Sequence, residues 1–216
     1  MTSGEVLALF RQEMNDNVAP YLWSDAEVYR YIDDAQRMFC RKTDGIGEAT
    51  NPLITEISIT PGTTWVDLHP TIKMIRSARR VDTGRPIQVV NEQDMPELGW
   101  FWNGTTGVVR GLVIGEEKDK AQVYPESNET MTVKLLVYRH PLEPIEGDQD
   151  FEIGEKHHLH LLHWIKSRAY LKQDSETYNK SKSEEFEGKF LKYCEESKLE
   201  DRKEKHKTRI VRYGGI

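Results

Sequence analysis

The pattern of apolar and polar positions divides the chain into three zones, and the first is helical. Residues 2–44 show helical spacing in two segments. Thr2 and Glu5 match a capping box at the start of the first segment, and Ser24 and Glu27 match one at the start of the second. This zone therefore predicts two helices.

The second of these segments carries the clearer amphipathic face. At about 100° of rotation per residue, its six large or apolar residues fall on one side of a helix. They are Val28, Tyr31, Ile32, Ala35, Met38 and Phe39. Gly45 and Gly47 then end the helix.

Between residues 50 and 145 the apolar positions change to the alternation typical of β-strands. Short apolar runs are separated by Pro-Gly, Asn-Gly and single glycines, which predict tight turns. The expected strands cover 57–60, 65–68, 72–81, 108–114, 121–124 and 131–138. An irregular excursion with a short helical turn is expected over residues 91–102. The zone predicts a small, mostly antiparallel β module.

Helical spacing returns near residue 155 and predicts one helix over 155–173 and another over 176–198. The remaining residues are mostly charged and end in a mixture of cations, Ile, Val and glycines, which predicts an extended tail.

The three zones together predict an α+β fold that is mainly α. We expect a bundle of about four helices, two from each end of the chain, with the β module inserted between them. The expected parts are a helical hairpin over 1–48, the inserted β module over 49–150, a second helical hairpin over 151–198 and a docking tail over 199–216.

Composition narrows the class of protein. The 216 residues are 37% hydrophobic and 31% charged, and five Trp, nine Tyr and six Phe can fill a small core, which argues against a wholly disordered chain. No apolar run approaches the ~20 residues of a membrane span, and the first residues lack the basic segment of a secretory signal. The two cysteines fit a reducing compartment. The net charge of -6 argues against a general nucleic-acid coat.

Four of the seven histidines lie between His157 and His163. His157, His160 and His163 recur every three residues, so neighbouring pairs could share a metal ion. Helical rotation spreads the three over about 120°, which is too wide for one ion unless the helix breaks. We favour structural or surface histidines, and a metal-dependent enzyme built on these three residues is the alternative.

Other signatures of catalysis or cofactor binding are missing from the sequence. It has neither a Gly-x-Ser-x-Gly nucleophile motif nor a phosphate-binding Gly-x-x-x-x-Gly-Lys-Ser/Thr loop. Cys40 and Cys194 fall within predicted helices among large apolar residues, which favours a packing role. We therefore assign no catalytic residue, no cofactor site and no metal site.

Two basic segments are candidates for binding a partner. The expected strand over 72–81 carries Lys73, Arg76, Arg79 and Arg80, which form either a partner face or the solvated face of a sheet. The tail is net basic on an acidic protein and is either a frayed helix end or a docking segment that buries its apolar residues on a partner. Its docking candidates are Lys205, Lys207, Arg209, Ile210, Val211, Arg212 and Tyr213.

Several motifs, in their order along the chain, resemble the head-to-tail adaptor (connector) proteins of tailed bacteriophages. The first is Pro-Tyr-Leu-Trp-Ser-Asp-Ala-Glu-Val over residues 20–28, and Tyr31-Ile32 and Ala35-Gln36 follow it. The second group comprises Trp102 with Thr106-Gly107, Val123-Tyr124-Pro125 and Val137-Tyr138-Arg139-His140-Pro141. The third comprises a helix with His158, Leu161, Leu162 and Ala169, then a loop and Phe186.

The resemblance implies a structural virion protein and not an enzyme. Such adaptors form a ring, usually of twelve copies, beneath the portal protein. They bridge the portal to a tail or nozzle protein and extend the channel through which DNA passes. Their C-terminal segments commonly dock on the portal, which here corresponds to residues from about 198 to 216. The resemblance also implies a location in the neck of the virion, after assembly in the bacterial cytoplasm, without a membrane partner.

The residues alone leave a third hypothesis open. Arg76, Arg79, Arg80 and the basic tail could form a nucleic-acid binding module, which would lose affinity steeply as salt is added. The acidic balance of the whole chain disfavours this hypothesis. The same balance instead suits a conduit that does not bind the DNA passing through it.

Overall fold

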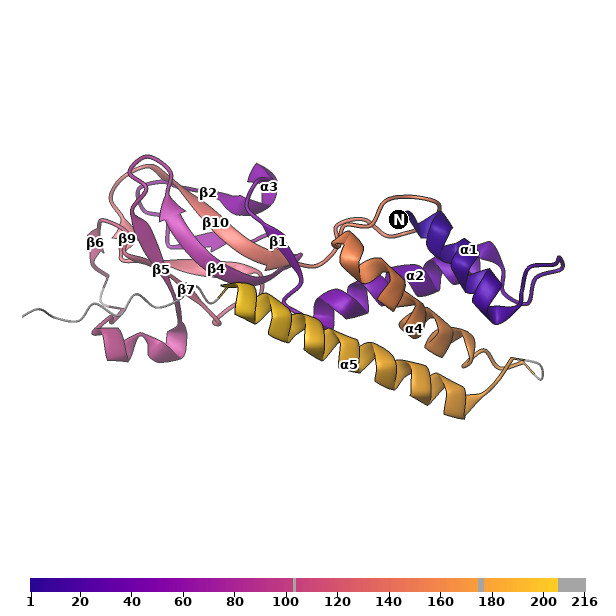
Figure 1. The fold of residues 1–216 in the computed structure, drawn as a ribbon. Helices are drawn as coiled ribbons and strands as arrows, with labels where there is room; N and C mark the ends of the chain where they lie inside the picture. Colours follow the sequence, from indigo (N-terminus) through magenta and orange to yellow (C-terminus); the bar gives the residue numbers. More distant parts are fainter. Residues whose placement is uncertain (103, 175–176, 206–216) are drawn as a thin grey trace, which may run out of the picture. The chain divides into compact units, whose positions relative to one another are not determined.

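The computed structural model describes residues 1–102, 104–174 and 177–205, and Lys205 is described by its backbone alone. The chain divides into two compact units, each treated separately below. The helical unit comprises Met1–Gly45 and Pro141–Ile216, and the sheet unit comprises Ile46–His140 (Figure 1).

The helical unit is built from four long helices and one short turn. They are α1 (Ser3–Met14), α2 (Asp25–Lys42), the 3-10 turn η3 (Glu155–His157), α4 (His158–Ala169) and α5 (Lys180–Lys205). α4 packs against α1, α2 and α5, so it forms the centre of this unit. α5 runs antiparallel to α4 along the length of α4 (Figure 1).

Side chains fix the starts of α1 and α2. The Thr2 hydroxyl accepts a hydrogen bond from the Glu5 amide, and the Glu5 carboxylate accepts one from the Thr2 amide, which confirms the capping box. The Ser24 hydroxyl accepts from the Glu27 amide at 3.3 Å. The Glu27 carboxylate, however, binds the Tyr31 hydroxyl and the Lys172 ammonium group, so the second box is formed only in part.

Several large aromatic side chains lie in the core of the helical unit. Trp164 on α4 is buried, its ring centroid lies 5.1 Å from that of Phe190 on α5, and its indole NH donates to Asp34 at 2.6 Å. Phe10 on α1 meets Trp23 edge to face at 5.5 Å. Burial of such rings, together with the aliphatic side chains around them, stabilises the packing of the four helices.

The sheet unit is formed around an eight-stranded sheet that curls into a half-barrel (Figure 1). The strand order is β1-β10-β4-β5-β7-β8-β3, and β2 pairs with β10 beyond β1. The strands are β1 (Ile46–Glu48), β2 (Glu56–Ile59), β3 (Trp65–Asp67), β4 (Ile72–Arg80), β5 (Pro86–Asn91), β7 (Gly111–Ile114), β8 (Lys120–Tyr124) and β10 (Met131–Arg139).

Short elements connect these strands. They are the helix α3 (Pro52–Thr55), the 3-10 turns η1 (Glu92–Asp94) and η2 (Pro96–Leu98), and the paired strands β6 (Thr106–Gly107) and β9 (Glu126–Ser127). The apolar residues of β10 alternate toward the interior, where Val133, Leu135 and Val137 are buried.

The predicted fold class is wrong. We expected a helical bundle with a small, mostly antiparallel β module, whereas the sheet is large, curled and mixed. The difference comes chiefly from β5, which pairs antiparallel with β4 at its start and then parallel with β7 from Gln88 onward. Its sequence begins with Pro86 and alternates poorly, so periodicity did not predict a strand there. This strand joins two smaller antiparallel groups into one sheet.

Candidate interaction surfaces

Three of the four cations predicted to form a partner face are exposed on β4. They are Lys73, Arg76 and Arg79. The register between β4 and β10 shifts twice, between Ser77 and Ile75 and again between Met74 and Ile72, so that Arg76 and Lys73 stand at the two irregularities. Such bulges bend a strand and redirect its side chains.

Arg80, the fourth predicted cation, has a different environment. Its side chain is buried, and it donates to both carboxylate oxygens of Asp82 at 3.0 and 2.7 Å and to Glu129 at 2.5 Å. The hydrogen bonds from Arg80 lower the pKa of the Asp82 carboxyl group to about 2. The guanidinium is therefore neutralised within its own unit, and it braces the turn after β4 against the loop before β10.

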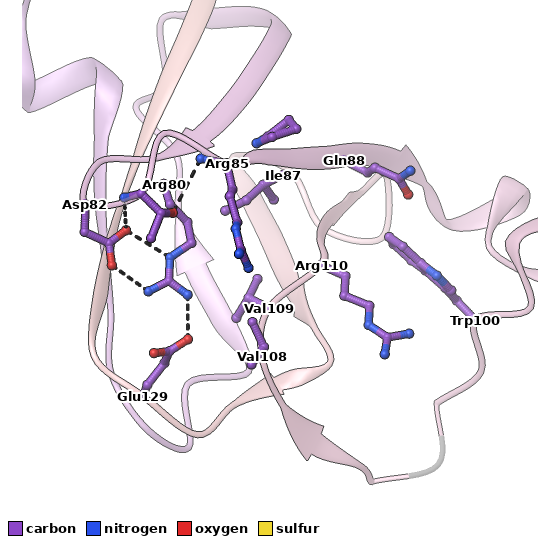
Figure 2. A pocket seen from close by; sticks show the side chains of 12 residues that line it. Arg80, Asp82, Arg85, Ile87, Gln88, Trp100, Val108, Val109, Arg110 and Glu129 are labelled. Atoms are coloured by element: carbon purple, nitrogen blue, oxygen red, sulfur yellow. Dashed lines mark hydrogen bonds and ion pairs between the residues drawn. The ribbon is translucent and has the colours of Figure 1, made fainter.

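Beside this ion pair the sheet opens into a groove of about 870 Å³ (Figure 2). It forms where the segment 108–110 diverges from the start of β5, and we call it the Arg85–Arg110 groove. Its lining includes Arg85, Ile87, Trp100, Val108, Val109 and Arg110, with Arg80, Asp82 and Glu129 at one end. In the part of the chain that the structure describes, neither Arg85 nor Arg110 forms an ion pair.

Trp100 forms the far wall of this groove and is held by close packing. Its ring stacks on Tyr124 with centroids 4.6 Å apart, and it is buried against Met95 and Val113. A Cβ atom added at Gly111 would lie under 3.0 Å from the indole ring, so only glycine admits the ring at this position. Trp100 is therefore held in position without a bound partner.

Large apolar side chains near the groove are exposed. Phe101 is 61% exposed, Val108 is 54% exposed and Trp102 is 47% exposed. Trp102 also lines a second hollow of about 210 Å³ together with Tyr124 and Pro125. Exposed aromatic residues that gather in one region are typical of a protein interface. The sequence predicted the irregular segment over residues 91–102, but Arg85, Trp100 and Arg110 were not selected as candidate binding residues. The Trp-Phe-Trp run over residues 100–102 was a signal that could have indicated an interface.

The loop end of the helical unit is a second apolar region. The α1–α2 loop exposes Val18, Tyr21 and Leu22, and the segment between α4 and α5 exposes Leu171 and Tyr178. These two segments lie side by side, because the Lys172 ammonium group donates to the Leu22 carbonyl at 2.6 Å (Figure 1).

The histidines of η3 and α4 mostly face aromatic rings of neighbouring helices. His157 Nδ1 lies 2.8 Å from the Tyr193 hydroxyl, and the His160 ring stacks on Tyr193 with centroids 3.6 Å apart. His163 faces Phe186 at 6.2 Å, and His158 Nε2 lies 3.0 Å from the Ile153 carbonyl. In residues 1–102, 104–174 and 177–205, no three His, Cys, Asp or Glu side chains are placed to hold a metal ion.

Both cysteines lie in the core of the helical unit. Neither Cys40 nor Cys194 forms a disulfide, and both are at most 1% exposed. Burial raises the pKa of the Cys194 thiol to about 12, so it stays protonated at neutral pH. This environment fits the packing role that we expected.

Most of the predicted docking tail lies outside the residues that the structure describes. Lys205 is the last residue of α5, described by its backbone, and the other six candidates lie outside the described residues. They are Lys207, Arg209, Ile210, Val211, Arg212 and Tyr213.

Among the described helices, none combines the length and the apolar character that a membrane span requires.

Comparison with known proteins identifies the class of protein to which this chain belongs. The chain belongs to the SU10 adaptor protein family, whose model matches residues 1–212. This family consists of structural adaptor proteins of bacteriophages, and it confirms the resemblance to head-to-tail adaptors. It implies a location in the neck of the virion and interaction with portal and tail proteins. A search of curated proteins finds no match.

Proposed function

We propose that this adaptor forms a closed ring, of about twelve copies, beneath the portal protein and bridges it to a tail or nozzle protein. The observation that carries the proposal is the family match over residues 1–212, nearly the whole chain. The ring extends the channel for DNA, which passes through without specific binding.

Exposed apolar residues on both units support ring formation. A ring requires two different complementary surfaces on each subunit, because its interface is heterologous and closes by rotation. The helical unit exposes Val18 and Tyr178 at its loop end, and the sheet unit exposes Phe101, Trp102 and Val108. Neighbouring copies or partner proteins would cover such residues in an assembly.

The charge balance supports a conduit that does not bind its cargo. A net charge of -6 limits contacts between cations and phosphates, which would add salt-dependent affinity and slow the DNA. Mapping the electrostatic potential of the lumen in an assembled ring tests this point, and a lumen lined mainly by unpaired Lys and Arg would contradict it.

The tail is proposed to dock on the portal. Its cations would find an acidic surface there, and Ile210, Val211 and Tyr213 would be buried. Deleting residues from Thr208 onward should abolish binding to the portal without unfolding the monomer. A matched control carries the same nine residues in scrambled order.

Electron microscopy of the protein mixed with its portal tests both parts of the proposal. We expect rings on the portal with the natural tail, and no complex with the deleted or scrambled tail. A truncated chain that still binds the portal would refute the docking role, and a natural chain that never forms a ring there would refute the proposed assembly.

A further inference from the structure

The Arg85–Arg110 groove has a charge excess that its own unit does not satisfy. Three arginines and two carboxylates line it. Arg80 engages both carboxylates, Asp82 and Glu129, so the excess lies on Arg85 and Arg110. Both are exposed, and neither has an ion-pair partner among the described residues. In Figure 2 the Arg85 side chain extends toward Val109, and the Arg110 side chain lies between Val109 and Trp100.

The groove is also apolar between these cations. Ile87, Val109 and Trp100 are buried side chains of its lining, and Val108 at its rim is 54% exposed. A ligand that matches both features needs carboxylates for the arginines and aliphatic groups for the surface between them.

We propose that the Arg85–Arg110 groove binds an extended acidic segment of a partner protein, with aliphatic side chains between its carboxylates. Each guanidinium can donate two parallel hydrogen bonds to a carboxylate, which makes this recognition directional. The groove is preformed, because Gly111 admits Trp100 and the Arg80 ion pair braces the opposite end, so little ordering is needed on binding.

Charge argues against nucleic acid as the occupant. Asp82 and Glu129 share the single positive charge of Arg80, so that end of the groove is net negative and would repel a phosphate backbone that continued past Arg85 and Arg110. A peptide can carry uncharged residues beyond the two arginines, whereas a nucleic acid carries a negative charge at every nucleotide.

A titration of the isotope-labelled full chain, followed by NMR, tests the proposal without any phage partner. The probe is a capped five-residue peptide that alternates Glu and Leu. Control peptides carry Gln in place of Glu or Ser in place of Leu, and a short single-stranded DNA oligonucleotide is the nucleic-acid control. We expect a saturable shift of the Trp100 indole and of the Val109 and Arg110 amides, and about tenfold weaker binding of either control peptide.

Variants decide whether the two arginines recognise the probe. The double variant Arg85→Gln with Arg110→Gln should weaken binding at least about tenfold, since it removes both charged contacts. The matched control, Arg76→Gln with Arg79→Gln, removes the same charge from exposed positions on β4 and should change the affinity less than about twofold.

Three results would overturn the proposal. They are the absence of saturable shifts up to the solubility limit of the Glu-Leu peptide, equal binding by the Arg85/Arg110 variant and the natural chain, and tighter binding of the oligonucleotide than of the peptide. The last result would assign the groove to nucleic acid. Because no portal is present, failure here leaves the proposed ring assembly unaffected.

Discussion

At the scale of single residues, Arg11 and Asp16 form an ion pair that is withdrawn from solvent. Arg11 Nη1 lies 2.7 Å from Asp16 Oδ2, and the two residues are 7% and 3% exposed. Asp16 also accepts a hydrogen bond from the Leu22 amide at 2.9 Å, and Arg11 donates to the Trp23 carbonyl at 3.0 Å. The pair therefore fixes the loop that presents the apolar end of the helical unit.

Removing the Asp16 charge should be costly. In Asp16→Asn the buried guanidinium loses its buried carboxylate and keeps the exposed carboxylate of Asp25 and the Trp23 carbonyl, so we expect the free energy of unfolding to fall by about 3–5 kcal/mol. Asp25→Asn is the control, because its side chain is 59% exposed and the change should cost less than about 1 kcal/mol. Urea denaturation followed by circular dichroism measures both, and equal losses would show that Asp16 has no special role.

Several residue-scale features could be predicted from the sequence, because they depend on neighbours a few positions away. Thr2 and Glu5 form the expected capping box, and Val28, Ile32, Ala35 and Phe39 are buried as the helical spacing indicated. The groove could not be predicted in this way. It brings together Arg85, Trp100 and Arg110, whose proximity depends on the parallel pairing of β5 with β7.

At the scale of elements, the contact between α4 and α5 concentrates much of the helical core. Phe190 is fully buried against Trp164. Phe190→Ala should therefore lower the free energy of unfolding by about 3–5 kcal/mol, through lost burial and the cavity that remains. Leu199→Ala on the same helix is the control, because Leu199 is 55% exposed and its truncation should change stability by less than about 0.5 kcal/mol. Comparable losses in urea denaturation would contradict the central place of Phe190.

The same helices predict a dependence of stability on pH. His157 is packed between Phe39 and Tyr193, and its pKa is lowered from 6.5 to about 4. Burial is the largest cause, the Lys156 charge acts in the same direction, and the Asp201 charge opposes the shift. The unfolded chain therefore binds the proton more readily, and its excess of bound protons makes stability fall as the pH decreases through this window. At neutral pH the contribution is fully present.

Between about pH 6.5 and pH 5, His157 should account for a loss of about 1.5 kcal/mol in the free energy of unfolding. His157→Gln should remove that part of the slope, whereas Tyr193→Phe should retain most of it, because burial is the largest cause of the lowered pKa and the ring at position 193 still covers His157. Urea denaturation at several pH values measures the slopes. An unchanged slope in His157→Gln would contradict the assignment.

The element scale is also where sequence reasoning failed. Most strands were predicted because their turns and alternation are local, but their order in the sheet is not. β5 is short, begins with Pro86 and changes partner from β4 to β7, and these pairings depend on residues distant in sequence. Without that strand the remaining strands suggested a small antiparallel module, and the fold class was misassigned.

At the scale of the whole molecule, the sheet unit is inserted into the helical unit through two adjacent crossings. Ile46 of β1 and Arg139 of β10 are register partners in an antiparallel ladder, so their Cα atoms lie about 5 Å apart. The chain thus leaves and returns at neighbouring points. The segment that follows the return belongs to the helical unit, since Ser3 binds the Gly147 and Gln149 carbonyls and the Ile145 amide donates to Asp33.

This topology predicts that the helical unit folds without its insertion. Replacing residues 46–140 with a Gly-Ser linker of about four residues should preserve the α-helical circular dichroism and a cooperative urea transition, because the core around Trp164 is retained. A control that removes residues 46–150 also deletes the segment bound to Ser3 and Asp33 and should be markedly less stable. A gradual, non-cooperative transition in the first variant would show instead that the helices depend on the sheet unit for their stability.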